Sequence, residues 1–187
     1  MHASSSIRSL REKPYDLLVA LDRRGQAASG VKSENPDGDR EWVGVAWRMA
    51  GEGYLVARDE TREVLPYPAQ LTRVPGARPW VKGLANLRGS LLPVIDLRQF
   101  LGSGVTPLTR NTRLLVVNHR DIPAGLMVDE VLGFRRFTDG EFSGEAPPTI
   151  VRCERFVAGA FRRGDEAWPV ISLRQLVENP GFLDAAA

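Results

Sequence analysis

The side chains best suited to catalysis are few in this chain and are poorly placed for it. Only two histidines, His2 and His119, could act as bases near neutral pH, and His2 lies close to the N-terminus. His119 stands between Asn118 and Arg120 at the end of an apolar run, a setting more typical of a loop-positioning residue than of a catalyst. The single cysteine, Cys153, has no neighbouring histidine to activate its thiol and is more typical of a small buried hydrophobe.

Carboxylates and glycines give no stronger indication of an active site. The adjacent pairs Asp129 with Glu130 and Asp165 with Glu166 would point to opposite faces of a strand, so neither predicts two cooperating carboxylates. The stretches AGEG, LRGS and FLGSG do not match a dinucleotide fingerprint, and the sequence has no GK(S/T) element to bind phosphate. The spacing of histidine and cysteine predicts no metal site. We therefore expect no catalytic residues, no metal and no cofactor.

A duplicated segment is the most informative feature of the chain. Residues 83–101 read GLANLRGSLLPVIDLRQFL and residues 159–177 read GAFRRGDEAWPVISLRQLV, and they align without a gap at an offset of 76 (159 − 83). Both contain the opening glycine, PVI and LRQ. Because a fixed offset of this kind indicates a repeated structural unit, we expect two related halves.

Each copy predicts a strand, a turn, a second strand and a short helix. In the first copy the apolar run LLPVI contains Pro93, which favours an edge strand or a bulge over a central strand. Asp96 is the expected N-cap of the helix, and Gly102 is its expected stop. In the second copy Ser172 is the expected cap, and the sequence NPG at 179–181 is the expected stop.

The composition is that of a chain that can bury a core but has no membrane-spanning segment. Of its 187 residues 43% are hydrophobic, yet no apolar run approaches the length needed to cross a bilayer. The first residues lack the apolar region of a secretory signal, and one cysteine cannot form an intramolecular disulfide. The 25 basic and 23 acidic residues are well mixed, which does not by itself indicate nucleic-acid binding. These features predict a cytoplasmic protein.

The chain is expected to divide into an N-terminal segment, a main body and a short tail. Residues 1–40 are expected to contain an amphipathic helix at Pro14–Arg24 and a flexible linker at 25–39. We favour a helix that packs on the body as a strut, because so short a helix is marginal alone, and a separate docking peptide is the alternative. Residues 41–182 are expected to form the body, and 183–187 the tail.

The body reads as a series of short strands. Alternation of apolar and small or polar positions starts at Trp42, and Leu71 and Val74 are expected to continue the series between prolines. Further strands are expected at 54–57, 114–117, 124–128, 131–137 and 156–161, with a loop at 139–149. Many short strands, two short helices and a duplicated unit predict a mainly β fold built from a pair of small β-barrels.

The two copies differ at the bend between their strands. The first copy has NLRG at residues 86–89, whereas the second has RRGD at residues 162–165. Arginine is favoured in protein interfaces because its planar head both hydrogen-bonds and stacks. From composition alone Arg88 is better interpreted as a solvated surface residue, and a partner contact is the alternative.

Long stretches of the sequence resemble the CheW-like domain, the coupling module of bacterial chemosensory arrays. WVKGLANLRGSLLPVIDLRQFLG resembles its signature, RLLVVNHRDIPAGLMVDEVLGF its strand pair entering the second barrel, and RFVAGAFRRGDEAWPVISLRQLV its closing strands and helix. The extended N-terminal segment, WVKGLANLRG and the ending NPGFLDAAA are most similar to the family's adaptor for type IV pili and twitching motility. The resemblance implies two five-stranded β-barrels in pseudo-twofold relation and a non-catalytic adaptor.

The resemblance also implies partners and the residues that would bind them. The partners would be the regulatory barrel domain of a CheA-type histidine kinase and the cytoplasmic tip of a methyl-accepting chemoreceptor. The protein would then be cytoplasmic and associated with membrane-bound receptor arrays, without inserting into the membrane. By matching motifs, the expected partner-binding residues are Glu63, Val64, Gly83, Leu84, Asn86 and Arg88.

Individual roles follow from the same resemblance. Arg88 is similar to the arginine of the array contacts, Glu63 with Val64 resembles a Glu-Ile step on a receptor-facing strand, and Leu84 would face the kinase barrel. The segment ARDETRE departs from the family pattern, because Arg58, Asp59 and Arg62 stand where many relatives have apolar residues. The receptor face is therefore expected to be more polar than usual.

Two other classes of function remain as alternatives. A small β-barrel that binds nucleic acid would need a basic groove with stacking aromatics, for which Phe134, Arg135, Arg136 and Phe137 are the candidates. An enzyme would need a role for His119 or Cys153 that their spacing does not support.

Overall fold

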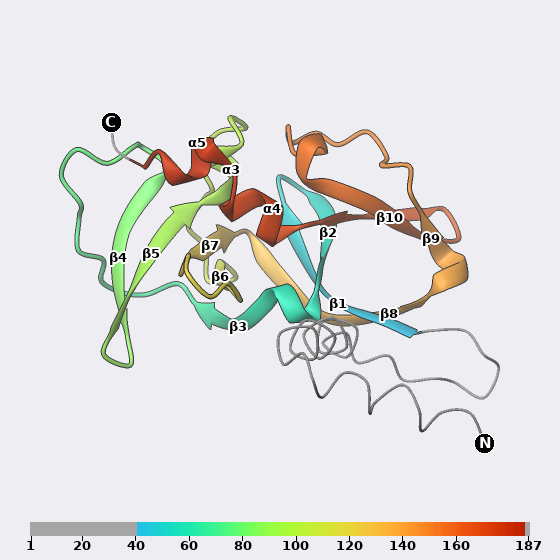
Figure 1. The fold of residues 1–187 in the computed structure, drawn as a ribbon, viewed down its shortest axis with the longest axis horizontal. Helices are drawn as coiled ribbons and strands as arrows, with labels where there is room; N and C mark the ends of the chain where they lie inside the picture. Colours follow the sequence, from blue (N-terminus) through green and yellow to red (C-terminus); the bar gives the residue numbers. More distant parts are fainter. Residues whose placement is uncertain (1–40, 186–187) are drawn as a thin grey trace, which may run out of the picture.

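Two β-sheets joined by short helices make up the body of the protein (Figure 1). The computed structural model describes residues 41–185. The helix predicted at 14–24 and its linker lie outside the described residues, so they stay predictions.

The larger sheet has six strands and contains the first and the last strand of the described chain. In order across the sheet these are β8 (Glu130–Thr138), β1 (Glu41–Met49), β2 (Glu52–Ala57), β11 (Glu166–Ile171), β10 (Val157–Arg163) and β9 (Phe142–Ser143). The smaller sheet has five strands in the order β3 (Thr61–Pro66), β6 (Arg113–Val117), β7 (Gly125–Val128), β5 (Ser90–Asp96) and β4 (Val81–Leu87).

Short helical segments connect or terminate these strands. The 3-10 turns are η2 (Arg58–Glu60), η3 (Asp139–Glu141) and η4 (Glu154–Phe156), and the α-helices are α3 (Leu97–Phe100), α4 (Leu173–Val177) and α5 (Pro180–Leu183). The α-helices lie along one side of the two sheets (Figure 1). The predicted mainly β fold with short helices is therefore confirmed.

The expected pair of five-stranded barrels is only partly right, since the sheets have six and five strands and their outermost strands are not paired within residues 41–185. Between β8 and β9 the turn η3 breaks the ladder. Between β3 and β4 the chain contains Pro68, Pro75 and Pro79, which cannot donate to a ladder. Leu71 and Val74 therefore do not continue the strand series, and only Thr72 between them pairs with a strand residue, Leu84.

The duplication seen in the sequence is a duplication of structure. β4 and β10 have the same bounds at an offset of 76 (157 − 81), and the helix that follows each hairpin begins at Leu97 or Leu173. Both predicted caps are confirmed, because Asp96 accepts a hydrogen bond from the backbone of Gln99 and Ser172 from that of Gln175. α4 ends at Val177, just before the predicted stop NPG, and the same residues also start a helix that was not predicted: Asn179 caps α5, with Pro180 at its first position.

Pro93 does not place β5 at an edge of the sheet. β5 pairs with β4 on one side and with β7 on the other, but pairing with β7 begins only at Val94. Pro93 thus lies just before the parallel ladder, where its missing N–H breaks no hydrogen bond to β7. The predicted bulge occurs on the partner strand, between Val81 and Gly83.

The shared motif divides its side chains between two kinds of core. Val94 and Val170 point into the small separate cores of the five-stranded and six-stranded sheets respectively. Ile95 and Ile171 point the other way, into one large core that also contains Trp47 and is common to both sheets. In each copy of PVI the valine therefore packs in the core of its own half, and the isoleucine packs in the core that connects the two halves.

The end of the chain returns to the first copy. Phe182 of α5 packs on Trp80 and Phe100, with ring centres 5.9 and 5.3 Å apart. Beyond α5, Asp184 forms an ion pair with Arg78 at 2.7 Å, and the backbone N–H of Arg78 donates to Ala185 at 2.9 Å. We call residues 180–185 the C-terminal strap.

The first hairpin forces a left-handed backbone on an arginine. Its two-residue loop, Arg88 and Gly89, has φ values of 51° and 85°, which match a type I′ turn. At the same position in the second copy stands Gly164, with a φ of 60°. A non-glycine residue in this region costs about 1 kcal/mol, so the first copy retains a side chain where glycine would fit better.

Replacing Arg88 by glycine should stabilise the fold. We expect Arg88→Gly to raise the free energy of unfolding by about 1 kcal/mol relative to Arg88→Ala, because alanine keeps the strain and glycine removes it. Urea unfolding followed by circular dichroism measures the difference, and Gly164→Ala is the mirror control, expected to lose a similar amount. An Arg88→Gly protein that unfolds before Arg88→Ala would contradict the assignment of strain.

The cap of α3 should matter more for stability than its position suggests. Asp96 is fully buried, accepts hydrogen bonds from the backbone and hydroxyl of Thr106 and lies 3.4 Å from Lys82. We expect Asp96→Ala to lower the free energy of unfolding by about 2 kcal/mol, since charged hydrogen bonds and a cap are lost together. Urea titrations should show no such loss for Asp165→Ala, an exposed carboxylate on the second hairpin.

Candidate functional site

The groups suited to catalysis have structural roles. Nδ1 of His119 accepts hydrogen bonds from the backbone of Asp121 and Ile122, and its Nε2 lies 3.1 Å from a carboxylate oxygen of Glu178. His119 therefore holds a loop, as its sequence context predicts. Cys153 is fully buried, and burial raises the pKa of its thiol, which keeps it protonated and a poor nucleophile.

The described residues also offer no grouped metal ligands. Within residues 41–185 no cluster of three or more His, Cys, Asp or Glu side chains could hold a metal ion. In the same part of the chain, no helix is long and apolar enough to cross a membrane.

Arg88 and Glu63 meet across the two outer strands of the five-stranded sheet. Glu63 lies in β3 and Arg88 at the tip of the β4–β5 hairpin, so they come from opposite ends of the strand order. The sheet curls enough to bring Nη2 of Arg88 within 3.4 Å of Oε2 of Glu63. Asn86 supports the tip by accepting a hydrogen bond from the backbone N–H of Gly89 at 2.9 Å.

An apolar cleft lies at the same seam between β3 and β4. It has a volume of about 190 Å³ and is lined by Leu65, Pro66, Pro68, Ala85, Asn86, Leu87, Leu92 and Leu114. Beside it Leu91, 63% exposed, projects from the hairpin, and Val64 is 38% exposed on β3. The seam therefore combines an exposed cation with accessible apolar surface, which is typical of protein interfaces.

Sequence reasoning missed most of this cleft and its exposed neighbour Leu91. The signal was available in the strand alternation, because Leu92 and Val94 point inward and Leu91 must then point outward. No sequence signal showed that Pro66 and Pro68 line the cleft, because their position next to β4 depends on the curvature of the sheet.

Gly83 and Leu84 lie away from the hairpin tip. Gly83 is buried with a φ of 143°, and a Cβ there would come within 2.5 Å of the backbone oxygen of Thr72. Leu84 is half-buried, and its backbone exchanges two hydrogen bonds with Thr72, at 2.8 and 2.9 Å. The structure thus gives Gly83 a close-packing role and leaves only the side chain of Leu84 to meet a partner.

The polar segment before Glu63 is divided between the turn η2 and the start of β3. Arg58 and Asp59 belong to the turn η2, and the guanidinium of Arg58 lies 5.9 Å from the ring centre of Phe134 on the six-stranded sheet. The backbone carbonyl of Asp59 accepts a hydrogen bond from the side chain of Asn118. Of the three polar residues, only the exposed Arg62 lies on the same strand as Glu63.

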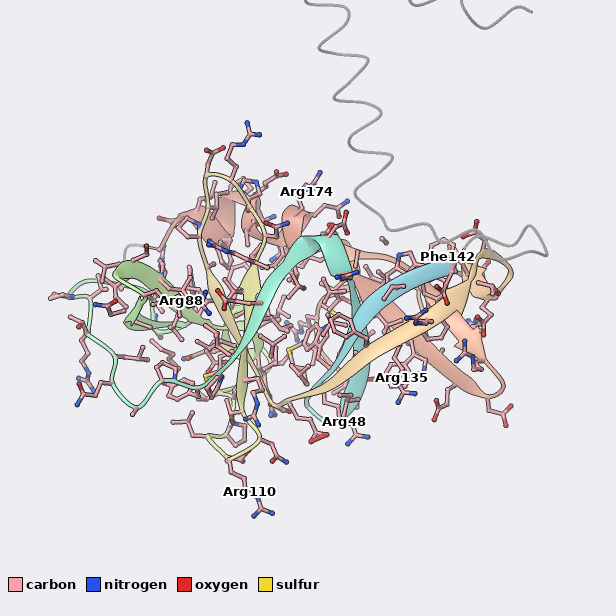
Figure 2. All side chains as sticks on the ribbon, turned by 90° about the horizontal axis from the view of Figure 1, so that it is seen from below. Arg48, Arg88, Arg110, Arg135, Phe142 and Arg174 are labelled. Atoms are coloured by element: carbon pink, nitrogen blue, oxygen red, sulfur yellow. The ribbon has the colours of Figure 1, made fainter. Side chains whose placement is uncertain are left out.

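One of the two arginines of the second hairpin, Arg163, is held much more firmly than Arg88 of the first. Arg163 donates to both oxygens of Glu141, at 2.6 and 3.0 Å, and its guanidinium lies 4.6 Å from the ring centre of Phe137. These bonds hold the pKa of Glu141 below its ordinary value. By contrast, within residues 41–185 the side chain of Arg88 makes one long contact, and 79% of it is exposed. Figure 2 shows Arg88 far from Phe142 and Arg135 of the other sheet.

The candidate nucleic-acid surface does not assemble. Phe134 is 67% exposed, but Phe137 is buried in the small core of its sheet. Arg136 forms an ion pair with Glu41 at 3.2 Å, and Arg135 lies over Trp168. A single exposed ring beside engaged arginines lacks the successive stacking platforms of single-strand binders.

Comparison with known proteins shows what the chain resembles. The family model of the CheW-like domain matches residues 44–180. The protein PilI of Pseudomonas aeruginosa is 39% identical over 175 residues, covering 94% of this chain and 97% of PilI. The chemotaxis protein CheW of Bacillus subtilis is 35% identical over 86 residues, covering 46% of this chain and 54% of that protein.

A solved structure shows the same fold. The crystal structure of the scaffolding protein CheW from Thermoanaerobacter tengcongensis superposes with a TM-score of 0.63 at 27% identity, over 75% of this chain and 94% of that one. The family match, over residues 44–180, includes both duplicated hairpins and the β3–β4 seam. The chain therefore belongs to the CheW-like domain family, a family of non-catalytic adaptors.

Proposed function

We propose that this protein couples methyl-accepting chemoreceptors to a CheA-type histidine kinase in a chemosensory array that controls type IV pilus twitching motility. The near full-length similarity to PilI supports the choice of system. The structural observation that supports the proposal is the difference between the two hairpins. Arg163 is bound to Glu141 of its own half, whereas Arg88 is exposed on a turn with a strained backbone.

Arg88 is suited to exchange its intramolecular partner for an external one. An exposed ion pair at 3.4 Å contributes little to stability, so replacing Glu63 by a partner's carboxylate or backbone carbonyl costs little. The guanidinium keeps most of its donors free for such a contact. The cleft beside it offers room for one apolar side chain of the partner, and a small interface of this kind gains strength from repetition in an array.

The two partners are proposed to use different edges of the five-stranded sheet. The receptor tip would contact β3, through Glu63 and Val64, where the strand is paired on one side only. The kinase barrel would contact the β4 edge through Leu84, with Arg88 and Asn86 at the tip close to both. Gly83 contributes indirectly, by allowing the Thr72 segment to cover the base of β4.

The remaining assignments follow from this role. Residues 41–182 would form the coupling body, with 1–40 as an N-terminal helix and flexible linker and 183–187 as a tail. The protein would work in the cytoplasm beside membrane-bound receptors, without a cofactor or a nucleic-acid ligand.

Substituting Arg88 should weaken assembly without unfolding the protein. We expect Arg88→Ala to reduce recovery of the ternary complex with purified kinase and receptor by about tenfold or more, because interface arginines often contribute over 1 kcal/mol. Arg162→Ala is the matched control, since Arg162 is an exposed arginine near the tip of the second hairpin. Circular dichroism would verify that both variants are folded.

Pull-down and kinase autophosphorylation assays would measure the effect. Equal losses for Arg88→Ala and Arg162→Ala would point to general charge rather than to the first hairpin. Full recovery of the complex with Arg88→Ala would exclude the proposed role of the tip.

A further inference from the structure

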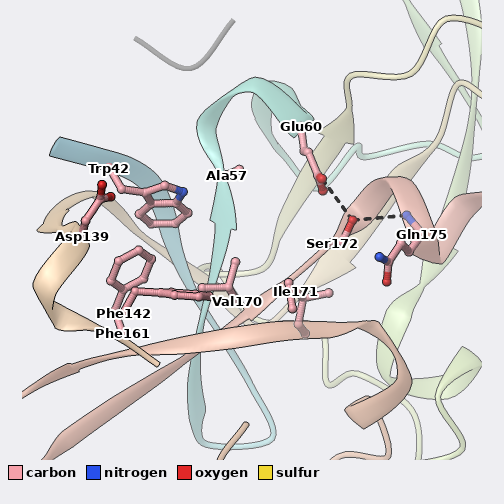
Figure 3. A pocket seen from close by; sticks show the side chains of 11 residues that line it. Trp42, Ala57, Glu60, Asp139, Phe142, Phe161, Val170, Ile171, Ser172 and Gln175 are labelled. Atoms are coloured by element: carbon pink, nitrogen blue, oxygen red, sulfur yellow. Dashed lines mark hydrogen bonds between the residues drawn. The ribbon is translucent and has the colours of Figure 1, made fainter. Parts of the chain in front are cut away.

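An apolar cleft of the described residues lies in the six-stranded half, away from the β3–β4 seam. It is a cleft of about 430 Å³ between β1 and β2 on one side and β9 and β10 on the other. Trp42, Phe142 and Phe161 form its aromatic wall, and Val170 its floor (Figure 3). This volume lies within the range of clefts that bind apolar groups.

The cleft opens directly onto the small core of its sheet. Phe161 and Val170 are members of that core, and the Trp42 ring packs on Phe161 with centres 4.5 Å apart. Phe142 nevertheless remains 45% exposed at the rim. An apolar segment seated here would extend a core of only five buried residues and cover an aromatic ring that now faces water.

The first strand of the described residues starts at this cleft. Strand β1 begins at Glu41, and Trp42, the next residue, is part of the wall. The 40 residues that precede β1 are therefore tethered at the rim of the opening. Any apolar segment among them is present at a high effective concentration, whereas a separate molecule would lose its translational freedom on binding.

One stretch of those residues has the right chemistry. In residues 14–24, PYDLLVALDRR, the leucines Leu17, Leu18 and Leu21 follow the spacing of one helical face. About 15 residues separate this stretch from β1, which as a coil reach about 20 Å. Arg23 and Arg24 end the stretch, and the carboxylate of Asp139 at the rim has no hydrogen-bond or ion-pair partner within residues 41–185.

We propose that residues 14–24 seat their leucines in the Trp42–Phe142–Phe161 cleft of the same molecule, with Arg23 and Arg24 near Asp139. The proposal selects the strut over the separate docking peptide. It does not depend on the proposed adaptor function, because it concerns only contacts within the chain.

Paramagnetic relaxation in the full-length protein tests this contact. A nitroxide would be attached to Asp16→Cys, on the face opposite the leucines, while buried Cys153 stays unlabelled. We expect the indole signal of Trp42 and the methyl signals of Ala57 and Val170 to lose most of their intensity. The methyl signals of Leu108, exposed on the other half, should keep theirs.

Matched substitutions make the result specific. Leu21→Asp should restore the cleft signals, whereas Val19→Asp, on the opposite helical face, should leave the broadening in place. Ala158→Trp, which fills the cleft from its own rim, should release the segment without altering it.

Three outcomes would overturn the proposal. The first is full intensity of the cleft signals in the spin-labelled parent protein. The second is an equal effect of Leu21→Asp and Val19→Asp, which would exclude a seated leucine face. The third is recovery of intensity when labelled protein is diluted with an excess of unlabelled chain that carries no nitroxide, because the occupant would then be a second copy.

Discussion

One large hydrophobic core, common to both sheets, is the constraint on which the rest of this structure depends. Each copy of the duplicated unit contributes Ile and Leu to it, as Ile95 with Leu97 and as Ile171 with Leu173. Because strand residues alternate between faces, the neighbouring valines are left to fill the two small separate cores. Position and orientation of the two halves are thus set by the same few repeated residues.

Duplication gave the protein two similar hairpins, and the structure shows how they have diverged. In the second, Arg163 donates hydrogen bonds to Glu141 and lies over the ring of Phe137, so it stabilises its own half. In the first, a strained turn presents Arg88 beside an apolar cleft. A residue that costs stability where glycine would fit is more readily explained by binding than by folding.

Much of the fold could be predicted from the sequence because each copy of the repeat contains local signals for its strands, its turn and its helix. The caps Asp96 and Ser172, the hairpins and the strand alternation are local features, and the structure confirms them. The division into six and five strands depends on long-range pairing, and so does the failure of Leu71 and Val74 to join a strand. A local sequence pattern does not determine such pairing. NPG follows the end of α4 as predicted, but the helix α5 that it also starts was not predicted, because the same residues can stop one helix and start another.

The candidate site was predictable in part. Motif resemblance pointed to Glu63 and Arg88, and the structure brings these two together. It could not show that Gly83 is buried under Thr72 or that a cleft opens beside Asn86, because both depend on the curvature of the sheet. The aromatic cleft around Trp42 is formed by residues far apart in the sequence, such as Trp42 and Phe161 at a separation of 119 positions (161 − 42), which no local pattern brings together.

The C-terminal strap has a mechanical consequence. It leaves α4 on the six-stranded half and fastens to Trp80, Phe100 and Arg78 on the other, so the two halves are clamped at a second place besides their common core. Two separate attachments oppose a hinge motion between the two halves. Bending of one half against the other would therefore have to break contacts both in the common core and at the strap.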